Sequence, residues 1–363
     1  MKLFRYLLLI LLVCNVPSIV QLGYGDLAGS LLSYATFGLL MIFYFLSKKH
    51  ALAWPFVIFA IIYFSIAGLV NVFDEQLYFI DFIKYLIIIV CGGELARSLS
   101  AKEMYVAFVI GSASILIHSA FFPDDYGRYS GFYLNANAAG FACLLGVALS
   151  YSIKKELWKN LGLAFCTFCG ILTFSRTFFL LWFLLVVISI FQNKKNFKIF
   201  GLGVGVILLF LSLAAILQVN DTRFSIFEAM FTQGVVSKSV EADSRTETWS
   251  LYYDKVYDSP FVGNGYLSFT SDNLHAEGAH NNYLRIIGEA GILPFLLFTG
   301  IMLYLLIKSV QYFKTEPWLF LLAVSIFSVN LTNHNFDTLQ YITLITLWLY
   351  FKLHENKVQT FEP

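Results

Sequence analysis

Long apolar runs separated by short polar segments make up most of the 363-residue chain. Runs of about 17 to 25 apolar residues are long enough to cross the hydrocarbon core of a bilayer as helices. The pattern predicts about twelve such helices, at residues 3–20, 27–46, 51–70, 78–96, 104–122, 133–152, 160–175, 177–192, 199–217, 282–307, 317–332 and 339–353. We expect an all-α, polytopic helical bundle of a bacterial inner membrane, with residues 1–363 forming a single integral membrane domain.

Residues 218–281 interrupt this pattern with a long polar segment between the ninth and tenth predicted helices. The segment is too polar to cross a membrane and too rich in aromatic residues to be plainly disordered. Its stretch DSRTETWSLYYDKVYDSP has helical character, with Asp243 or Ser244 able to cap the helix and Pro260 ending it. We therefore expect a large periplasmic loop that forms a helical cap and carries part of the active site.

The composition agrees with a membrane protein, because 58% of the residues are hydrophobic, 13% are charged and the mean hydropathy is +0.72. A net charge of +1 without a basic stripe argues against a nucleic-acid partner. The five cysteines lie in apolar runs, so we expect no disulfides. The spacing of Cys166 and Cys169 resembles a metal or redox pair, but within a membrane helix it favours ordinary packing.

Charge is distributed unevenly between the loops. With the amino terminus in the cytoplasm, most Lys and Arg residues fall in inside loops and most acidic residues fall outside, as the positive-inside rule requires. The basic residues on the outside therefore need another explanation, and a cluster of cations there indicates an anionic ligand on the periplasmic side. These residues are Arg128, Arg176, Arg223, Lys238, Arg245, Lys255 and Arg285, together with His280.

The first candidate motif is GRYSGFYLNANAAG, which begins at Gly127. Arg128 precedes a helix that starts near Asn135 or Asn137, and either asparagine could cap it. The free amides of such a helix start favour an anion. The alternative is that these asparagines only cap the helix, while the small residues that follow allow close helix packing.

Arg176 interrupts a second apolar stretch, LTFSRTFFLLWFLL. An arginine at membrane depth costs about 2.5 to 3.5 kcal/mol on insertion scales, so it normally faces a polar cavity or a partner. The alternative is an interfacial turn between two short helices, assisted by Ser175 and Thr177, with Arg176 reaching into the headgroups.

The stretch SRTETW contains Arg245, Glu247 and Trp249. A guanidinium can bind two phosphate oxygens at once and keeps its charge at any physiological pH. On its own, however, an arginine on an exposed helix is more often a solvated charge or a partner for Glu247 or Glu241.

The last motif is HNNYLRIIGEAG, from His280 to Gly291. A histidine can accept a proton near neutral pH, and His280 stands just before a predicted helix. Its alternative is a structural role as the cap of the helix that begins at Asn282. Arg285 and Glu289 are four residues apart and share a helix face, so they could bind substrate or simply pair with each other.

Taken together and in this order, the motifs resemble the O-antigen ligase/polymerase superfamily, the Wzy/WaaL-like membrane glycosyltransferases. The resemblance implies a glycan donor on an undecaprenyl diphosphate carrier at the periplasmic face, with no metal or cofactor. It implies that Arg176 and Arg245 hold the diphosphate and that His280 activates or orients the acceptor hydroxyl. It places Arg128, Asn135, Asn137, Asn281, Arg285 and Glu247 in substrate binding. The resembling segments are Arg128–Asn137, Thr173–Arg176, Ser244–Trp249, Pro260–Gly265 and His280–Asn281 followed by Gly291.

Pro294 departs from the ligase pattern, which has Gly, Thr or Tyr there, and the chain is shorter than a typical ligase. Both points favour a polymerase that joins repeat units of O-antigen or a related surface polysaccharide. A ligase to lipid A-core and a protein O-oligosaccharyltransferase remain alternatives. A flippase is less favoured, because it should carry polar residues through both leaflets. Expected partners are the lipid-linked glycan donor and acceptor, membrane lipids and a chain-length regulator protein.

Overall fold

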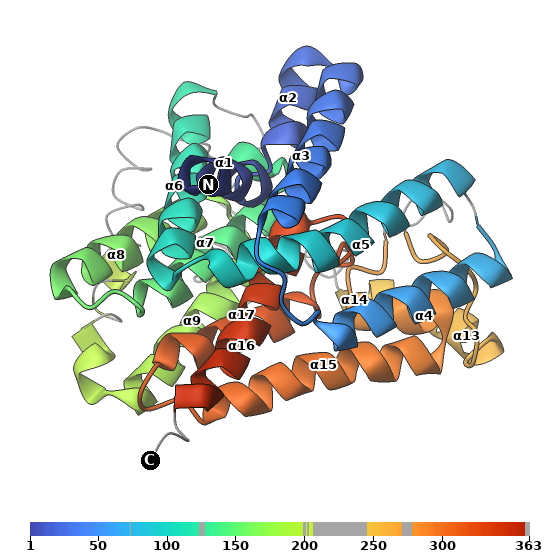
Figure 1. Cartoon of the computed structure of the whole chain (residues 1–363). Coiled ribbons are helices and arrows are strands. Elements are labelled where there is room, and N and C mark those ends of the chain that lie inside the picture. Colours follow the sequence, from blue (N-terminus) through green and yellow to red (C-terminus); the bar gives the residue numbers. More distant parts are fainter. Residues whose placement is uncertain are drawn as a thin grey trace.

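The computed structural model describes residues 1–72, 74–122, 128–198, 201, 203–205, 245–270 and 278–359, without the side chains of 245–247 and 355–359. Regular structure in these ranges is helical apart from an isolated parallel bridge between Val72 and Tyr266 (Figure 1). The longer helices are α1 (Lys2–Val13), α2 (Val16–Tyr24), α3 (Asp26–Leu46), α4 (Trp54–Val70), α5 (Glu75–Ser98), α6 (Ala101–Phe121), α7 (Ala136–Ser150), α8 (Glu156–Leu172), α9 (Arg176–Gln192), α13 (Arg245–Asp258), α14 (Asn282–Ala290), α15 (Ile292–Val310), α16 (Pro317–Val329) and α17 (Gln340–Gln359).

Three of the described helices, α3, α6 and α15, are long and apolar enough to cross a membrane, and α1 with α2 would make a fourth span if counted as one bent pair. Four shorter apolar helices accompany them, namely α4, α7, α9 and α16. The apolar helices confirm the all-α class and indicate a membrane protein. Twelve spans and a periplasmic cap stay predictions, and most of the predicted span 199–217 lies outside the described residues.

Two predicted spans are not continuous helices. The first, 3–20, bends by 64° between α1 and α2, where Asn15 adopts a left-handed conformation. The predicted span 282–307 divides at Gly291, whose φ of +79° ends α14 before α15 begins. Hydropathy could not show either break, because apolar residues continue on both sides of each. The second break matters for the site, since it separates α14 and its charged residues from the apolar α15.

Helix α7 forms the centre of one half of the bundle and packs against α6, α8, α9 and α16. Every residue from Ala138 to Ser150 is buried. Small residues permit this close packing, as the sequence predicts; a side chain at Gly146, for example, would meet the Cys166 sulfur. Cys166 and the other four cysteines are buried and unpaired, consistent with packing.

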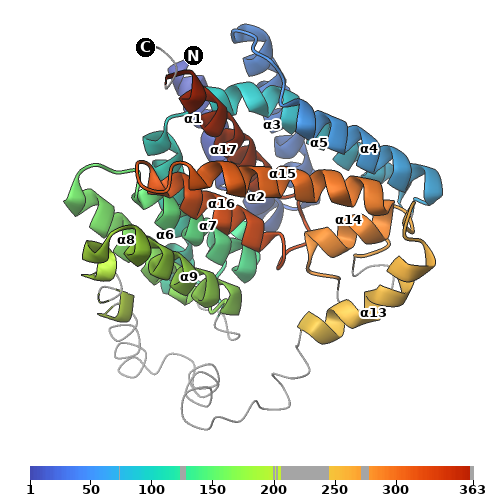
Figure 2. The same cartoon turned by 90° about the horizontal axis from the view of Figure 1, so that it is seen from below.

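Consecutive packing of α6 to α9 places their connections alternately at two ends of the bundle. The backbone N–H of Tyr129 donates to the carbonyl of Leu172 at 3.3 Å, so the connections after α6 and after α8 meet. At the opposite end, Lys198 pairs with Glu156. In Figure 2, α14 and α13 lie together on the right of the molecule, and α8 and α9 lie to the left.

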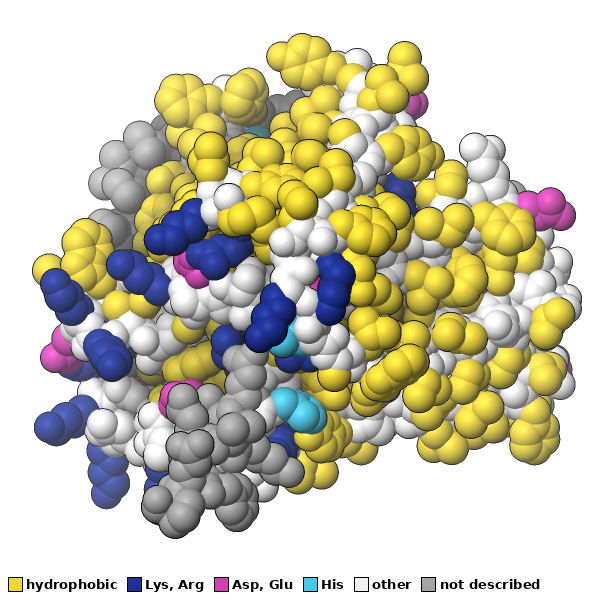
Figure 3. All heavy atoms as spheres, in the orientation of Figure 1, with side chains coloured by type: hydrophobic (Ala, Val, Ile, Leu, Met, Phe, Trp, Pro, Cys, Tyr) yellow, Lys and Arg dark blue, Asp and Glu magenta, His cyan; other side chains and the backbone are white. Residues whose placement is uncertain are grey.

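Apolar side chains cover much of the surface in Figure 3, while Lys and Arg gather toward the left and centre. Helices α2 and α3 expose several large apolar side chains, including Leu22, Tyr24 and Leu31. A surface of this kind is stable against lipid rather than water.

Candidate functional site

Arg128 joins two helix starts. Its Nη2 donates to Asn137 Oδ1 at 3.0 Å and its Nε to the Thr173 carbonyl at 3.4 Å. Ser175 Oγ donates to the same Asn137 oxygen, also at 3.0 Å. The motif around Arg128 and the turn before Arg176 therefore form one cluster, although more than forty residues separate Arg128 from Ser175 along the chain.

The cluster brings the amino termini of α7 and α9 side by side. Asn135 caps α7, since its Oδ1 accepts from the backbone N–H groups of Asn137 and Ala138. Ser175 caps α9 by accepting from Phe178 N–H, and Phe174 takes a left-handed φ of +48° in the turn. Capping by Asn135 and the break before α9 both follow the sequence predictions. Each helix start carries a partial positive charge.

Arg176 is exposed as the first residue of α9. A cation at a helix amino terminus is electrostatically unfavourable, because it repels the positive end of the helix dipole. Arg128 and two helix amino termini lie nearby, so the electrostatic potential of this region is positive. Such a region favours the binding of an anion.

Asn281 and His280 precede α14. Asn281, which is buried, caps the helix by accepting from Leu284 N–H at 3.1 Å. The helix begins at Asn282 as the sequence predicts, but Asn281 and not His280 is its cap. Asn281 thus has a structural role in addition to any contact with substrate.

His280 adopts a left-handed backbone with φ of +45°, which is uncommon for a residue with a side chain. Its N–H donates to His334 Nδ1 at 3.1 Å, and the two rings lie 4.6 Å apart between centroids. Burial, with His280 and Arg285 nearby, lowers the pKa of His334 to about 3. His334 is therefore neutral near pH 7 and holds the strained backbone of His280 as a hydrogen-bond acceptor.

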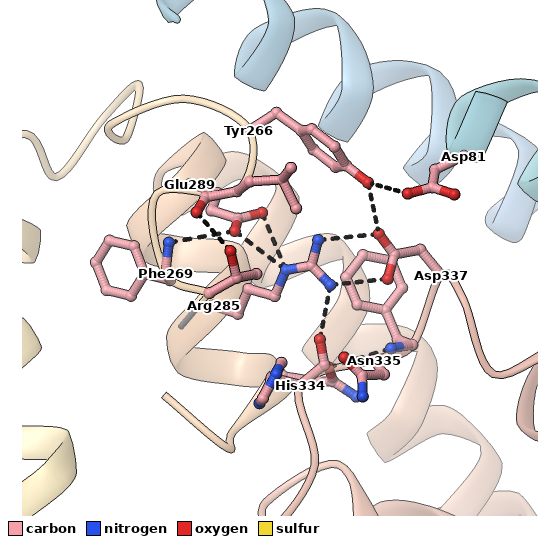
Figure 4. Close-up of polar contacts among 12 residues, drawn as sticks. Asp81, Tyr266, Phe269, Arg285, Glu289, His334, Asn335 and Asp337 are labelled. Atoms are coloured by element: carbon pink, nitrogen blue, oxygen red, sulfur yellow. Dashed lines mark hydrogen bonds and ion pairs between the residues drawn. The ribbon is translucent and has the colours of Figure 1, made fainter. Parts of the chain in front are cut away.

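Arg285 lies at the centre of a buried ion-pair network (Figure 4). Its side chain is 2% exposed. Its Nε donates to Glu289 at 3.1 Å, and its two terminal nitrogens donate to Asp337 at 2.7 and 2.9 Å. The pairing with Glu289 is the alternative that the helix spacing offered. With two carboxylates around the guanidinium, this geometry favours a structural over a substrate-binding role for Arg285.

Two tyrosines complete the network. Tyr63 of α4 donates to Glu289, and Tyr266 donates to Asp81 of α5 at 2.8 Å, with Asp337 at 3.3 Å. These residues come from five separate parts of the chain. Each carboxylate thereby gains hydrogen bonds that offset part of its desolvation cost.

Glycines in the segment from Pro260 to Gly265 allow it to close over the carboxyl end of α14. Asn264 N–H donates to the Gly288 carbonyl at 2.8 Å and Gly265 N–H to the Glu289 carbonyl at 3.0 Å. Gly263 and Gly265 have φ of +71° and +96°, and a Cβ at Gly263 would overlap the Glu289 backbone. This motif therefore fixes the carboxyl end of α14.

The α16–α17 connection links α14 to the arginine cluster. Asn282 Nδ2 donates to Asn330 Oδ1 at 2.6 Å, which attaches α14 to the start of this connection. A small pocket of about 10 Å³ lies between Asn137 and Thr177 on one side and Thr332 and Asn333 on the other. The α16–α17 connection thus contacts both α14, which follows His280, and the amino termini of α7 and α9.

We call this region, comprising residues 128–137, 173–177, 278–290 and 330–341, the motif end. The comparison with known families bears on it directly. Residues 161–299 match the family model described as O-antigen ligase. The match supports the O-antigen ligase/polymerase superfamily and, with the apolar helices, a membrane enzyme that transfers a lipid-linked glycan. No curated protein matches the chain.

The matched residues include Arg176, Arg245 and His280, whereas Arg128, Asn135 and Asn137 precede them. Arg245 begins α13, but its side chain and that of Glu247 lie outside the described residues. Helix α13 ends at Asp258, before Pro260, as predicted. It packs against α14, and Asn264 Nδ2 connects the two by donating to the carbonyls of Lys255 and Gly288.

Sequence reasoning missed Asp81, Asp337, His334 and the two tyrosines. Asp81 stands within a predicted span, where an ionisable residue is by itself a signal of function or pairing. The polar run from Asn330 to Asp337 separates two apolar helices. It was a second indication of functional or paired residues. Tyr63 and Tyr266 gave none, because tyrosines are common both in apolar runs and in the aromatic-rich segment 218–281.

Proposed function

We propose that this protein polymerises undecaprenyl-diphosphate-linked oligosaccharide repeat units into O-antigen or a related surface polysaccharide at the periplasmic face of the inner membrane. The observation that carries the proposal is the convergence of Arg128, Arg176 and two helix amino termini beside the pocket at the motif end. A diphosphate leaving group develops negative charge as the glycosidic bond to the carrier breaks. Fixed cations and amide dipoles stabilise such charge best when they are already in place.

Arg176 and Arg245 would hold the diphosphate, since a guanidinium pairs with two phosphate oxygens at once. Asn137 supports this arrangement by orienting Arg128 through the 3.0 Å bond to its Nη2. No step requires a metal in this proposal, because the arginines and helix starts supply the positive charge.

His280 would accept the proton of the acceptor hydroxyl as that oxygen attacks the anomeric carbon. The bond from oxygen to carbon forms while the bond from carbon to the diphosphate oxygen breaks, and the proton moves to a ring nitrogen of His280. The hydrogen bond to His334 stabilises the left-handed backbone of His280, and this backbone conformation sets the position from which the His280 side chain extends. His334 is therefore a positioning residue.

A ligase that moves finished glycan to lipid A-core is the second candidate, and the description of the matching family favours it. Donor chemistry is the same in both. Pro294, which is buried in the first turn of α15, departs from the ligase pattern and favours polymerisation.

A deletion strain separates the two candidates. Loss of a polymerase leaves ligation intact, so lipid A-core should carry a single repeat unit on a silver-stained gel. Loss of a ligase leaves bare core while long glycan accumulates on the lipid carrier. We expect the single-repeat pattern, and bare core with accumulated carrier-linked polymer would overturn the polymerase assignment.

The proposed orientation, with both termini in the cytoplasm and residues 218–281 in the periplasm, rests on the distribution of Lys and Arg among the loops. Reporter fusions test it. A reporter that works only in the cytoplasm should be inactive after Val219, and an active fusion at that position would reverse the orientation.

A further inference from the structure

A second charged region lies away from the motif end, where the start of α1 and the carboxyl ends of α3 and α5 meet. These segments border an open pocket of about 450 Å³, whose charged lining is formed by Lys2, Arg5, Lys48, Glu94 and Arg97, with His50. Asp81 and Arg97 are sixteen residues apart on α5, so the pocket is about 24 Å from the buried network along that helix.

Positive charge exceeds negative charge in this pocket. Glu94 accepts from His50, at 3.0 Å from its backbone N–H and at 2.8 Å from Nδ1. Glu103, beside the pocket, pairs with Arg5. Lys2 and Lys48 are exposed and form no ion pair among the described residues. Both carboxylates are thus already engaged, and the remaining cations are left to face the pocket.

Two arginine donors at the pocket are buried without a partner. Arg5 Nε and Arg97 Nε each lack a hydrogen-bond acceptor among the described residues, although at least one terminal nitrogen of each side chain is engaged. Arg5 Nη1 donates to the Ser98 carbonyl at 2.8 Å, and Arg97 Nη2 donates to the Ala51 carbonyl. The Arg97 guanidinium also lies 3.6 Å from the centre of the Phe351 ring. Both guanidinium groups belong to residues that line the pocket, so they add to its positive charge.

The surroundings of the pocket are apolar. Exposed side chains of α1 and α3 flank it, among them Leu3, Leu7, Phe45 and Leu46. In Figure 3 apolar surface adjoins the basic patch near the α3–α4 connection. A small hydrophilic anion would gain nothing from these neighbours, whereas acyl chains would cover them.

We propose that this pocket binds an anionic phosphate group, supplied by a phospholipid whose acyl chains lie along α1 and α3. Lys2 and Lys48 attract the phosphate, and the guanidinium groups of Arg5 and Arg97, which line the pocket, add positive charge beside it. The site is independent of the glycan transfer proposed above.

Native mass spectrometry of the purified full-length protein in detergent tests the proposal. Phosphatidylglycerol and phosphatidylcholine with the same acyl chains are added at equal concentrations. We expect phosphatidylglycerol to be retained preferentially, and the double variant Lys2→Gln/Lys48→Gln to lower its affinity by about 25-fold, at about fivefold per cation. Arg97→Gln should have a similar effect. Both lysines are exposed, so the double variant folds even if Arg97→Gln does not.

Lys102→Gln is the matched control, since Lys102 is exposed near the start of α6 and does not line the pocket. It should retain phosphatidylglycerol like the original chain. Inorganic phosphate added without lipid distinguishes the two sources of the anion: if it raises the unfolding temperature and only the lysine double variant loses the effect, the site holds free phosphate. Equal retention of both lipids without a phosphate effect, or equal loss in the double variant and in Lys102→Gln, overturns the site.

Discussion

Arg176 and Arg285 show opposite uses of the same side chain at one end of the molecule. Arg176 is exposed at the start of a helix, where the helix dipole opposes its charge. Arg285 is 2% exposed and lies between Glu289 and Asp337, which neutralise it within the protein. Arg176 is therefore accessible to a ligand, whereas Arg285 is enclosed and neutralised by two carboxylates.

The contrast teaches that a basic residue on the expected substrate side is not by itself a substrate ligand. What distinguishes the two arginines is which side chains the fold brings to them. Substitutions at Arg285 should therefore act mainly on stability, while substitutions at Arg176 should act mainly on glycan transfer.

Arg285→Gln has the largest expected effect. Removing the cation leaves two buried carboxylates without their partner, and breaking a buried ion pair in this way costs about 3 to 5 kcal/mol. We expect low membrane levels on immunoblots and a large fall in the unfolding temperature of the protein in detergent. A variant that reaches normal levels and normal stability, yet makes no polymer, would give Arg285 a direct role and break the comparison.

Arg176→Lys should have the second-largest effect. We expect it to lower glycan transfer and to leave stability almost unchanged. Lysine keeps the charge but loses the two-pronged bond to phosphate, so we expect a fall of about 10- to 100-fold in polymer formation. The free energy of unfolding should change by no more than about 0.5 kcal/mol, as for most surface substitutions. The control is Lys194→Gln, an exposed cation that follows α9 at the opposite end of that helix. Normal polymer in Arg176→Lys would remove this arginine from diphosphate binding.

The sequence could predict interactions between residues that are close together along the chain. Capping by Asn135, the turn before Arg176 and the start of α14 at Asn282 depend on neighbouring residues, and the sequence predicts them. The pairing of Arg285 with Glu289 is also local, at helix spacing. It was therefore available as an alternative before the fold was known.

Contacts between distant segments could not be predicted. Asp337 reaches Arg285 across more than fifty residues, and Tyr63 reaches Glu289 from α4. The break at Gly291 was hidden for another reason, because α15 continues the apolar run with little change in hydropathy. The pattern of apolar and polar residues thus predicted most helices. The distant partners of the charged residues became known only from the structure.

Tyr266→Phe should weaken the buried network without abolishing it. The hydroxyl donates to Asp81, with Asp337 close by, and Asp337 keeps its two bonds from Arg285. We expect a loss of about 1.5 kcal/mol in the free energy of unfolding, the lower end for a hydrogen bond to a charged group. Thermal unfolding in detergent measures it.

Tyr133→Phe is the matched control, because the hydroxyl of Tyr133 is buried without a hydrogen-bond partner. Its removal should be neutral or slightly stabilising. Equal losses for the two substitutions would mean that the network contributes no more than packing does.

His334→Asn should have the smallest effect. It should change the stability of the protein only at acidic pH. The pKa of His334 is lowered to about 3 in the folded protein and is close to 6.5 when unfolded. The unfolded chain therefore binds more protons between these values, and stability falls as the pH drops from 6.5 toward 3. Asparagine retains an acceptor for His280 N–H without titrating, so the variant should lose less stability over this window. Parallel stability curves for the two proteins would contradict this assignment.

The most direct measurement is the release of undecaprenyl diphosphate from a lipid-linked oligosaccharide by the purified full-length protein, followed together with thermal unfolding. The account predicts that the original chain releases the carrier and extends the glycan, that Arg176→Lys loses most of this turnover while unfolding at the same temperature, and that Arg285→Gln loses stability first. Turnover that is unchanged in Arg176→Lys, or no carrier release by the stable original chain supplied with donor and acceptor, would contradict it.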